Sequence, residues 1–365
     1  MPHFDPDAAA KPGSGIFGLP TAGARDEARI ILLPVAFDAT TSYGGGASAG
    51  PEAILEASAQ VDLFDLQFGR IYEAGIFMDD IDQSIAALSR KARAIAEPII
   101  AKGGAEHGDA ADTIAVAQVN EAGEKVNAYV YEHTRAVLAQ RKIAGLVGGD
   151  HATPFGAIKA CAEFAAASGE ALGILQIDAH MDLRESFEGF RWSHASIMWN
   201  VLREIPQVAR IVQIGIRDFG EGELRLAQQA AQTRNPNDSW NTDAAPGRVA
   251  VHFDLEWQRR LMRGGQFELM CRQALESLPR LVYISFDIDG LDPALCPGTG
   301  TPVPGGLSFN QAAVLLETLV ATGRRIIGFD LNEVCPGPDN NEWNANVGAR
   351  ILYKLCGAAA ATLPK

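Results

Sequence analysis

Aspartate and histidine recur in three short segments of the chain, at spacings that suit metal binding. These segments are Gly148-Gly149-Asp150-His151, Asp178-Ala179-His180-Met181-Asp182 and Asp287-Ile288-Asp289-Gly290-Leu291-Asp292-Pro293. Side chains two residues apart in an extended chain point the same way. Asp178, His180 and Asp182 therefore face a common point if the chain stays extended there, and Asp287 and Asp289 repeat the spacing.

With His151, these five residues make a set of four carboxylates and two imidazoles. Carboxylates crowded together repel one another, and their charges are costly to bury without cations. Two divalent cations would provide the missing positive charge. A mixed histidine and carboxylate set without thiolates suits Mn²⁺, Ni²⁺, Co²⁺ or Fe²⁺ better than structural zinc. Each segment alone is also compatible with a turn or a helix cap, but their joint occurrence favours a metal centre.

The elements that must position these residues are visible as apolar, β-branched runs. There are six such runs, at residues 30–35, 143–147, 172–177, 211–216, 281–286 and 325–329. Nearly continuous apolar runs are typical of buried parallel strands. Alanine-rich stretches at helical spacing lie between them, at 116–140, 152–167 and 308–322. Strand–helix alternation predicts an α/β fold with helices on both faces of a parallel sheet.

The polar segments follow the second, third, fifth and sixth apolar runs directly; the sixth leads into Asp330-Leu331-Asn332-Glu333. In open α/β sheets, ligands bind beyond the carboxyl ends of the strands. We therefore expect these segments to meet at one edge of the sheet, although more than a hundred residues separate the first from the last.

Length and composition limit the classes of protein. The 365 residues are 47% hydrophobic and 21% charged, with a formal net charge of −14. We expect an extended arm over residues 1–26 and a single domain over 27–365. The acidic balance disfavours nucleic acid and anionic membranes as partners. Five scattered cysteines, the lack of a CxxC pair and the lack of a membrane-length apolar stretch predict a cytoplasmic protein.

The three signature segments, in this order, resemble those of the ureohydrolases: arginases, agmatinases and related hydrolases of guanidino compounds. The resemblance covers roughly residues 33–356 and is strongest to the agmatinase-related branch, which includes hydrolases of guanidine and biguanides. It implies a three-layer α/β/α sandwich with a mainly parallel central sheet. It also implies two divalent ions per chain, manganese by family default with nickel as the alternative. The assembly implied is a homo-oligomer, a trimer or hexamer, with a hetero-oligomer as the alternative.

The resemblance assigns roles to individual residues. It makes His151 a ligand of the first ion and His180 a ligand of the second, with Asp178 and Asp287 bridging both. Asp182 completes the first site and Asp289 the second. Asp150 and Asp292 are implied to support the ligands through hydrogen bonds.

Two further positions match the family's catalytic pair. Glu333 corresponds to the glutamate that pairs with the substrate guanidinium, and His194, in Trp192-Ser193-His194-Ala195-Ser196, to the histidine that carries protons near the leaving amine. Asp182 is also implied to orient the attacking water. Ala152, Ala195 and Asn332 depart from the commoner family pattern; they border the pocket and leave the substrate open.

The loop over 182–192 is bulky and aromatic, unlike the arginase pattern, so arginine is a poor candidate substrate. Phe187, Phe190, Trp192 and Trp199 are candidate pocket walls, with core packing expected for at least two of them. The expected reaction cleaves a C–N bond of agmatine or of free or N-substituted guanidine, releasing urea and an amine.

Three alternatives stay open. The first alternative is a biguanide (metformin-like) hydrolase subunit that releases an alkylamine. The second is a non-catalytic partner subunit of such a hetero-oligomer. The third alternative is a deacetylase-like amidohydrolase with a single zinc ion, which would not need His151. The number of metal ions per chain separates this last class from the others.

Overall fold

The computed structural model describes residues 4–11, 13–21, 24–231, 247–337 and 342–364. Its centre is a sheet of eight strands. The strands are β1 (Ile30–Val35), β2 (Ile76–Met78), β3 (Ile143–Gly148), β4 (Leu172–Ile177), β5 (Val208–Ile216), β6 (Val249–Phe253), β7 (Leu281–Asp287) and β8 (Arg325–Asn332). They are ordered β2-β1-β3-β8-β7-β4-β5-β6, and every neighbouring pair is parallel.

This arrangement confirms the predicted parallel sheet and all six predicted strands. The sequence did not reveal β2 and β6, which are the two outermost strands. Both are short, and residues 250–253 of β6 are only partly buried. An edge strand packs against fewer neighbours than a central one, so it needs no long apolar run to mark it.

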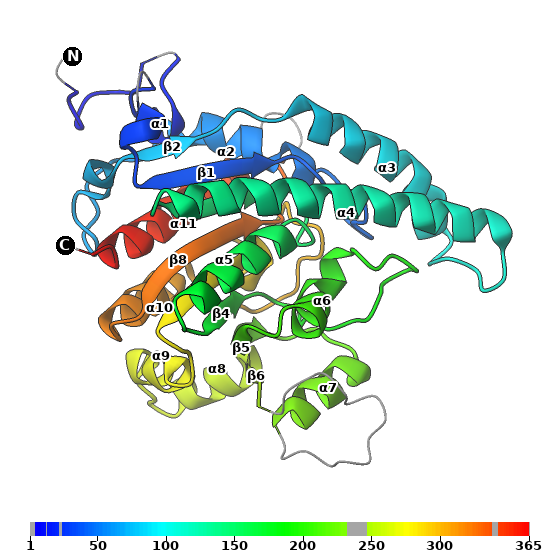
Figure 1. Ribbon diagram of the computed structural model, residues 1–365. Helices are drawn as coiled ribbons and strands as arrows, with labels where there is room; N and C mark the ends of the chain where they lie inside the picture. Colours follow the sequence, from blue (N-terminus) through cyan, green and yellow to red (C-terminus); the bar gives the residue numbers. More distant parts are fainter. Residues whose placement is uncertain (1–3, 12, 22–23, 232–246, 338–341, 365) are drawn as a thin grey trace.

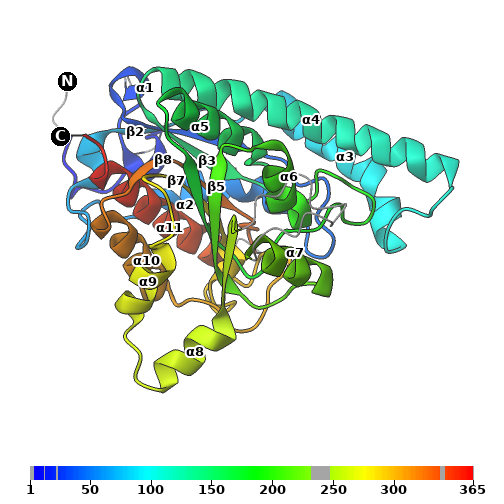
Figure 2. The same ribbon diagram turned by 60° about the horizontal axis from the view of Figure 1, so that its bottom comes forward.

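Helices form a layer on each face of the sheet (Figures 1 and 2). One layer contains α2 (Gly50–Ser58), α8 (Asp254–Met262), α9 (Phe267–Leu275), α10 (Phe309–Ala321) and α11 (Trp343–Ala361). The other contains α3 (Gln83–Ala101), α4 (Ala110–Ala139), α5 (Phe155–Ala167), α6 (Ile197–Glu204) and α7 (Glu221–Ala231). The fold is therefore the predicted three-layer α/β/α sandwich.

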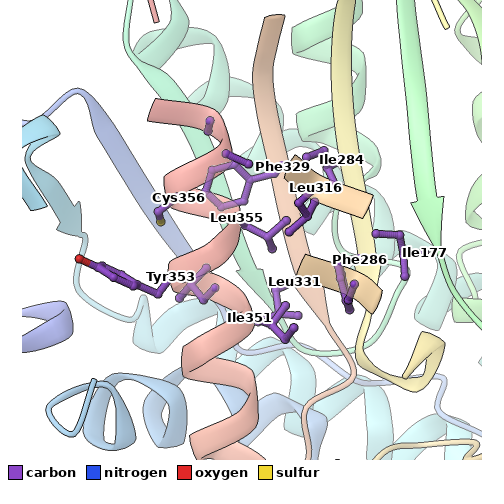
Figure 3. Close-up of a cluster of buried hydrophobic side chains, with 14 of the residues drawn as sticks. Ile177, Ile284, Phe286, Leu316, Phe329, Leu331, Ile351, Tyr353, Leu355 and Cys356 are labelled. Atoms are coloured by element: carbon purple, nitrogen blue, oxygen red, sulfur yellow. The ribbon is translucent and has the colours of Figure 1, made fainter. Parts of the chain in front are cut away.

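Side chains that alternate along each strand fill the two interfaces. On β4, Leu175 and Ile177 belong to the core beneath α11, whereas Leu172 and Ile174 belong to the core beneath α4 and α5. Figure 3 shows the first of these interfaces, where Ile351 and Leu355 of α11 approach Phe329 and Leu331 of β8. All four of these side chains are fully buried. The burial fixes the strands, and with them the positions at which their carboxyl ends emerge.

Part of the amino-terminal region packs on the body. Ile16 and Phe17, in a 3-10 turn (η1, Ile16–Gly18), are buried, and the Phe17 N–H donates to Ser58 Oγ at 2.8 Å. The Phe17 ring also meets Tyr353 of α11 edge-on, with centroids 4.7 Å apart. A short helix, α1 (Ala24–Glu27), precedes β1. None of the helices in the described part of the chain is long and apolar enough to span a bilayer.

Candidate metal centre

Four adjacent central strands, β3, β8, β7 and β4, bring the predicted residues together. His151 follows β3, Glu333 follows β8, and Asp178 follows β4. Asp287 ends β7, and Asp289 lies in the 3-10 turn that follows it (η5, Ile288–Gly290). Because all four strands are parallel, their carboxyl ends lie at one edge of the sheet, as the sequence predicted.

The first group of ligand atoms surrounds Nδ1 of His151. This nitrogen lies 3.0 Å from Asp178 Oδ2, 3.0 Å from Asp182 Oδ2 and 3.3 Å from Asp287 Oδ2. The ligand atoms of His151, Asp178 and Asp287 all lie within 4.8 Å of one another, close enough to hold one ion.

The second group surrounds His180. Its Nδ1 lies 3.0 Å from Asp289 Oδ2 and 3.6 Å from Asp178 Oδ1. Asp178, His180 and Asp289 again place ligand atoms within 4.8 Å of one another. Asp178 therefore belongs to both groups, with Oδ2 toward His151 and Oδ1 toward His180. Only His180 is substantially exposed, at 23% of its side chain, so the centre opens to solvent on that side.

The backbone past β4 departs from the expected extended path. β4 ends at Ile177, and Asp182 adopts a left-handed conformation with φ 54°. The extended path on which the common direction of these side chains was made conditional is therefore interrupted at Asp182, yet Asp178 and Asp182 both lie 3.0 Å from His151 Nδ1. The Asp182 carbonyl accepts hydrogen bonds from the N–H groups of Met198 and Trp199 in the first turn of α6. These bonds hold the turn that directs the Asp182 carboxylate toward His151.

Close backbone packing explains the glycines before His151. A Cβ on Gly149 would overlap the Phe37 carbonyl, so a side chain there would displace the turn that carries Asp150 and His151. Asp150 is fully buried; its Oδ1 accepts from the Ala152 N–H and its Oδ2 from Thr40 Oγ1. It supports the ligand loop, the role that the resemblance implied for it.

Asp292 is not buried beside the ligand loop as Asp150 is. Its side chain is exposed, and its Oδ1 accepts only the nearby Ala294 N–H among the described contacts. Asp292 therefore caps a turn after the ligand loop.

Negative charge outweighs positive charge at this centre. None of the four ligand aspartates forms an ion pair with lysine or arginine in the described parts of the chain; their partners are His151 and His180. Burial, then repulsion from Asp178, raises the pKa of Asp182 to about 7. Burial, then repulsion from Asp289 and Asp178, raises the pKa of Asp287 well above its usual range. Cations would relieve both penalties, so the donor set fits two divalent ions.

The pKa values of the two histidines are raised as well, which for an imidazole favours the charged form. Burial disfavours the charged form of His180, but Asp289 and Asp178 outweigh it and raise its pKa to about 12. The same balance, with Asp178, Asp182 and Asp287 as partners, raises the pKa of His151 well above its usual range. Metal binding requires neutral imidazole, so protons and metal ions compete for this centre.

Glu333 lies beside the first group. It has a left-handed backbone with φ 64°, and its N–H donates to the Gly149 carbonyl at 2.8 Å. Its Oε1 accepts the His151 N–H at 2.9 Å, whereas Oε2 is buried and has no hydrogen-bond partner. Burial, then repulsion from Asp287 and Asp150, raises the pKa of this carboxyl well above its usual range. A buried acceptor without a donor is suited to receive a cationic one.

His194 begins a 3-10 turn (η4, His194–Ser196) and is nearly buried. Burial, then repulsion from His180 and His151, lowers its pKa to about 3, so its imidazole is neutral at pH 7. The Phe187 ring meets the His194 ring edge-on, with centroids 5.9 Å apart.

Two of the four candidate pocket-wall residues pack in the core, as expected. Phe190 and Trp192 are buried in the core. Trp199 lines a surface hollow with Arg203, so Phe187 is the aromatic residue that lies against the predicted catalytic histidine.

The sequence did not indicate the residues that contact the second ring nitrogen of His151, Nε2. Its Nε2 lies 2.9 Å from Ser285 Oγ, which donates to Asp330 Oδ1 at 3.2 Å. Asp330 also accepts from Asn332 Nδ2 at 2.6 Å, which gives Asn332 a structural role. The available signal was a polar residue inside an apolar run, two positions before Asp287.

The sequence is similar to proteins of known family. The sequence matches the model of the arginase family over residues 28–246 and 255–357. It is 32% identical to an N(1)-aminopropylagmatine ureohydrolase of Thermus thermophilus, over 91% of this chain and 90% of that protein. It is also 28% identical to an agmatinase of Pyrococcus horikoshii, over 94% and 95%.

Solved structures share the fold. Proclavaminate amidino hydrolase from Streptomyces clavuligerus superposes with a TM-score of 0.68 at 22% identity, covering 98% of this chain and all of that one. Arginase from Medicago truncatula superposes with a TM-score of 0.63 at 22% identity, covering 91% and 88%. Both the family match and the relatives extend over nearly the whole chain, including all three signature segments. The chain belongs to the arginase family.

Proposed function

We propose that this chain is a binuclear-metal hydrolase that cleaves a C–N bond of a small linear guanidino compound and releases urea and an amine. The observation that carries the proposal is the pair of ligand groups that share Asp178, with an unpartnered carboxylate oxygen of Glu333 beside them. The family supplies the reaction class, hydrolysis of non-peptide C–N bonds.

His151, Asp178, Asp182 and Asp287 would hold one ion, and His180, Asp289 and Asp178 the other, with Asp287 as the second bridging ligand. Two divalent ions that share a water lower its pKa and so supply a nucleophile at neutral pH. The sharing of Asp178 is what places the two ligand groups next to each other.

Glu333 would bind the guanidinium group. Its Oε1 is held by the His151 N–H, so the carboxylate has a fixed orientation and offers Oε2 to the substrate. A guanidinium donates two parallel hydrogen bonds, and its positive charge balances the negative charge of a buried carboxylate. This contact would fix the planar carbon beside the ligand groups and reduce the entropy cost of reaction.

His194 would move the proton that the leaving nitrogen needs. Because its imidazole is neutral at pH 7, it can accept a proton when water attacks and then deliver it to the departing amine. The Phe187 ring packs edge-on against the His194 ring and is its aromatic neighbour in the described structure.

The names of the relatives support a linear amine-bearing substrate. They include agmatinases and aminopropylagmatine ureohydrolases, together with a proclavaminate amidinohydrolase. We therefore rank agmatine and its N-substituted forms first, free guanidine next and arginine last.

A substrate panel tests the proposal. Purified protein, loaded separately with Mn²⁺ and Ni²⁺, is assayed with agmatine, N(1)-aminopropylagmatine, guanidine, guanidinobutyrate, arginine and a biguanide, and both urea and amine are measured. Urea from a linear guanidino compound is the expected result. An alkylamine without urea from the biguanide would replace this substrate class with the biguanide one, and no turnover of any compound by folded, metal-loaded protein would contradict the proposal.

The Glu333→Gln variant tests the role of the carboxylate. It removes the charge that pairs with the guanidinium, so we expect kcat/KM to fall by about 100-fold, as for loss of a buried charge-assisted pair. The metal content should stay at the wild-type value, because Glu333 belongs to neither ligand group. Unchanged kcat/KM would show that another residue binds the guanidinium.

A further inference from the structure

Two glutamines lie side by side inside the sheet, close to the metal centre. Gln176 of β4 and Gln213 of β5 are register partners, and both are fully buried. The residues two positions before them, on the same face, are apolar: Ile174 on β4 and Ile211 on β5. On the other neighbouring strand, β7, the register partner of Gln176 is Ser285.

The two amides form a chain that leads to Asp178. Gln213 Nε2 donates to Gln176 Oε1 at 2.6 Å and to the Met181 carbonyl at 2.7 Å. Gln176 Nε2 donates to Asp178 Oδ2 at 2.9 Å, with a longer contact of 3.3 Å to the His180 carbonyl. Both amides are therefore anchored to the segment that carries the ligands.

These contacts determine how the Asp178 carboxylate is turned. Its Oδ1 accepts the His180 N–H at 2.6 Å, and its Oδ2 accepts from Gln176. Each oxygen has its own donor, so rotation of the carboxylate would break two hydrogen bonds at once. In this orientation Oδ2 faces His151 and Oδ1 faces His180.

The arrangement leaves one polar atom unsatisfied. Gln213 Oε1 is buried and has no hydrogen-bond partner. An unsatisfied buried acceptor costs about 1–3 kcal/mol, and the structure retains this cost while the two amides supply donors to Asp178 Oδ2 and the Met181 carbonyl. A buried amide pair that retains this cost while it orients a ligand points to a role in the metal centre.

We propose that Gln176, held in place by Gln213, is a positioning residue that keeps one oxygen of Asp178 directed at each ion. The proposal rests on the two-ion centre of the proposed function. It assigns the amide pair to the assembly of the bridging ligand, and neither glutamine touches substrate or metal.

Metal binding by the apoprotein tests this role directly. Wild type and the Gln176→Leu variant are stripped of metal and titrated with Mn²⁺ by calorimetry, with the bound ions counted by elemental analysis. We expect two ions per wild-type chain, and Mn²⁺ affinity about 10- to 100-fold weaker in the variant, as for other residues that support metal ligands.

Gln213→Leu and the double variant show whether the two hydrogen-bonded glutamines act as a unit. Gln213→Leu alone should weaken Mn²⁺ binding by a smaller factor, because Gln176 keeps its bond to Asp178. In the Gln176→Leu background the second substitution should weaken Mn²⁺ binding no further. If each substitution weakened Mn²⁺ affinity by its own factor and the two factors multiplied in the double variant, Gln213 would not act through Gln176, and this part of the proposal would be overturned.

Apoprotein stability measures the structural part of this role. The double variant should unfold at a lower denaturant concentration than wild type, because Asp178 Oδ2 and the Met181 carbonyl lose their side-chain donors. Thr318→Val, which removes a buried hydroxyl in α10, is the matched control and should leave Mn²⁺ affinity unchanged. If Gln176→Leu fails to fold, Gln213→Leu, which keeps the donor to Asp178, provides the affinity, and an unchanged Mn²⁺ affinity in that variant would overturn the role of Gln213.

The outcomes distinguish the two proposals. Wild-type Mn²⁺ affinity in both Gln176→Leu and the double variant would overturn the positioning role and leave the proposed function intact. A wild-type protein that binds no divalent ion would overturn the proposed function, and the positioning role with it.

Discussion

A second aspartate–histidine cluster lies beside the outermost strand β2, apart from the metal centre, and the two balance charge differently. The second cluster, here called the Asp79 cluster, consists of Arg25 of α1, Asp79 at the end of β2 and His133 of α4. Arg25 Nε lies 2.6 Å from Asp79 Oδ1, and His133 Nε2 lies 2.6 Å from Asp79 Oδ2. One carboxylate thus has two basic partners from the chain itself.

The pKa values express the contrast. Burial opposes the charge of Asp79, but hydrogen bonds from His133 and Arg25 outweigh it and lower its pKa to about 2. At the metal centre, burial and neighbouring carboxylates raise the pKa of Asp182 to about 7. At the Asp79 cluster, partners within the chain balance the carboxylate charge, whereas the metal centre needs cations that the chain does not provide.

Asp178→Asn should have the largest effect. The substitution weakens both ligand groups, so we expect loss of at least one ion per chain and a fall in kcat of about 100-fold or more. Elemental analysis and urea release measure the two effects. Asp292→Asn is the matched control, because that exposed aspartate lies in a signature segment but only caps a turn. Full turnover by Asp178→Asn would mean that the two ligand groups do not act together.

Binding of divalent ions should raise the free energy of unfolding, an effect smaller than that of Asp178→Asn on turnover and larger than that of Asp79→Asn on stability. At a free concentration of 100 times Kd, one bound ion adds about 2.7 kcal/mol to the free energy of unfolding. Thermal unfolding of the apoprotein with increasing Mn²⁺ should therefore show a rising midpoint. The rise should be the same in Asp79→Asn, since the Asp79 cluster contributes no ligand; a smaller rise in that variant would mean that the two clusters are coupled.

Asp79→Asn should have the smallest effect, and only on stability. Its contacts are partly exposed, so we expect a loss of about 1–2 kcal/mol in the free energy of unfolding, with kcat unchanged. Because folding lowers the pKa of Asp79 from 3.8 to about 2, its stabilisation is present above about pH 4 and is lost as the pH falls toward 2.

Urea unfolding of wild type and Asp79→Asn at several pH values checks that sign. The difference between the two proteins should be constant at neutral pH and should shrink as the pH falls below about 4. A difference that grows on acidification would contradict the assignment of Asp79 as a charge-paired carboxylate.

Much of the centre was predictable because most of its ligand residues lie in short segments with a regular spacing. The DxHxD and DxD spacings identify Asp178, His180, Asp287 and Asp289, and the apolar runs before them identify the strands. His194 and Glu333 were found only through the family resemblance, since a lone histidine or glutamate has no local signal. Gln176 was missed because a single amide within an apolar run reads as part of a strand.

Residue types and spacing by themselves determined the α/β alternation, the excess of carboxylates over cations and the edge of the sheet at which they would lie. Tertiary structure alone decided that β3, β8, β7 and β4 are neighbours, because strand order depends on how helices pack on both faces. It also decided the left-handed turns at Asp182 and Glu333, which contacts from distant segments hold in place. Local sequence encodes which side chains are available, and long-range packing determines which of them meet.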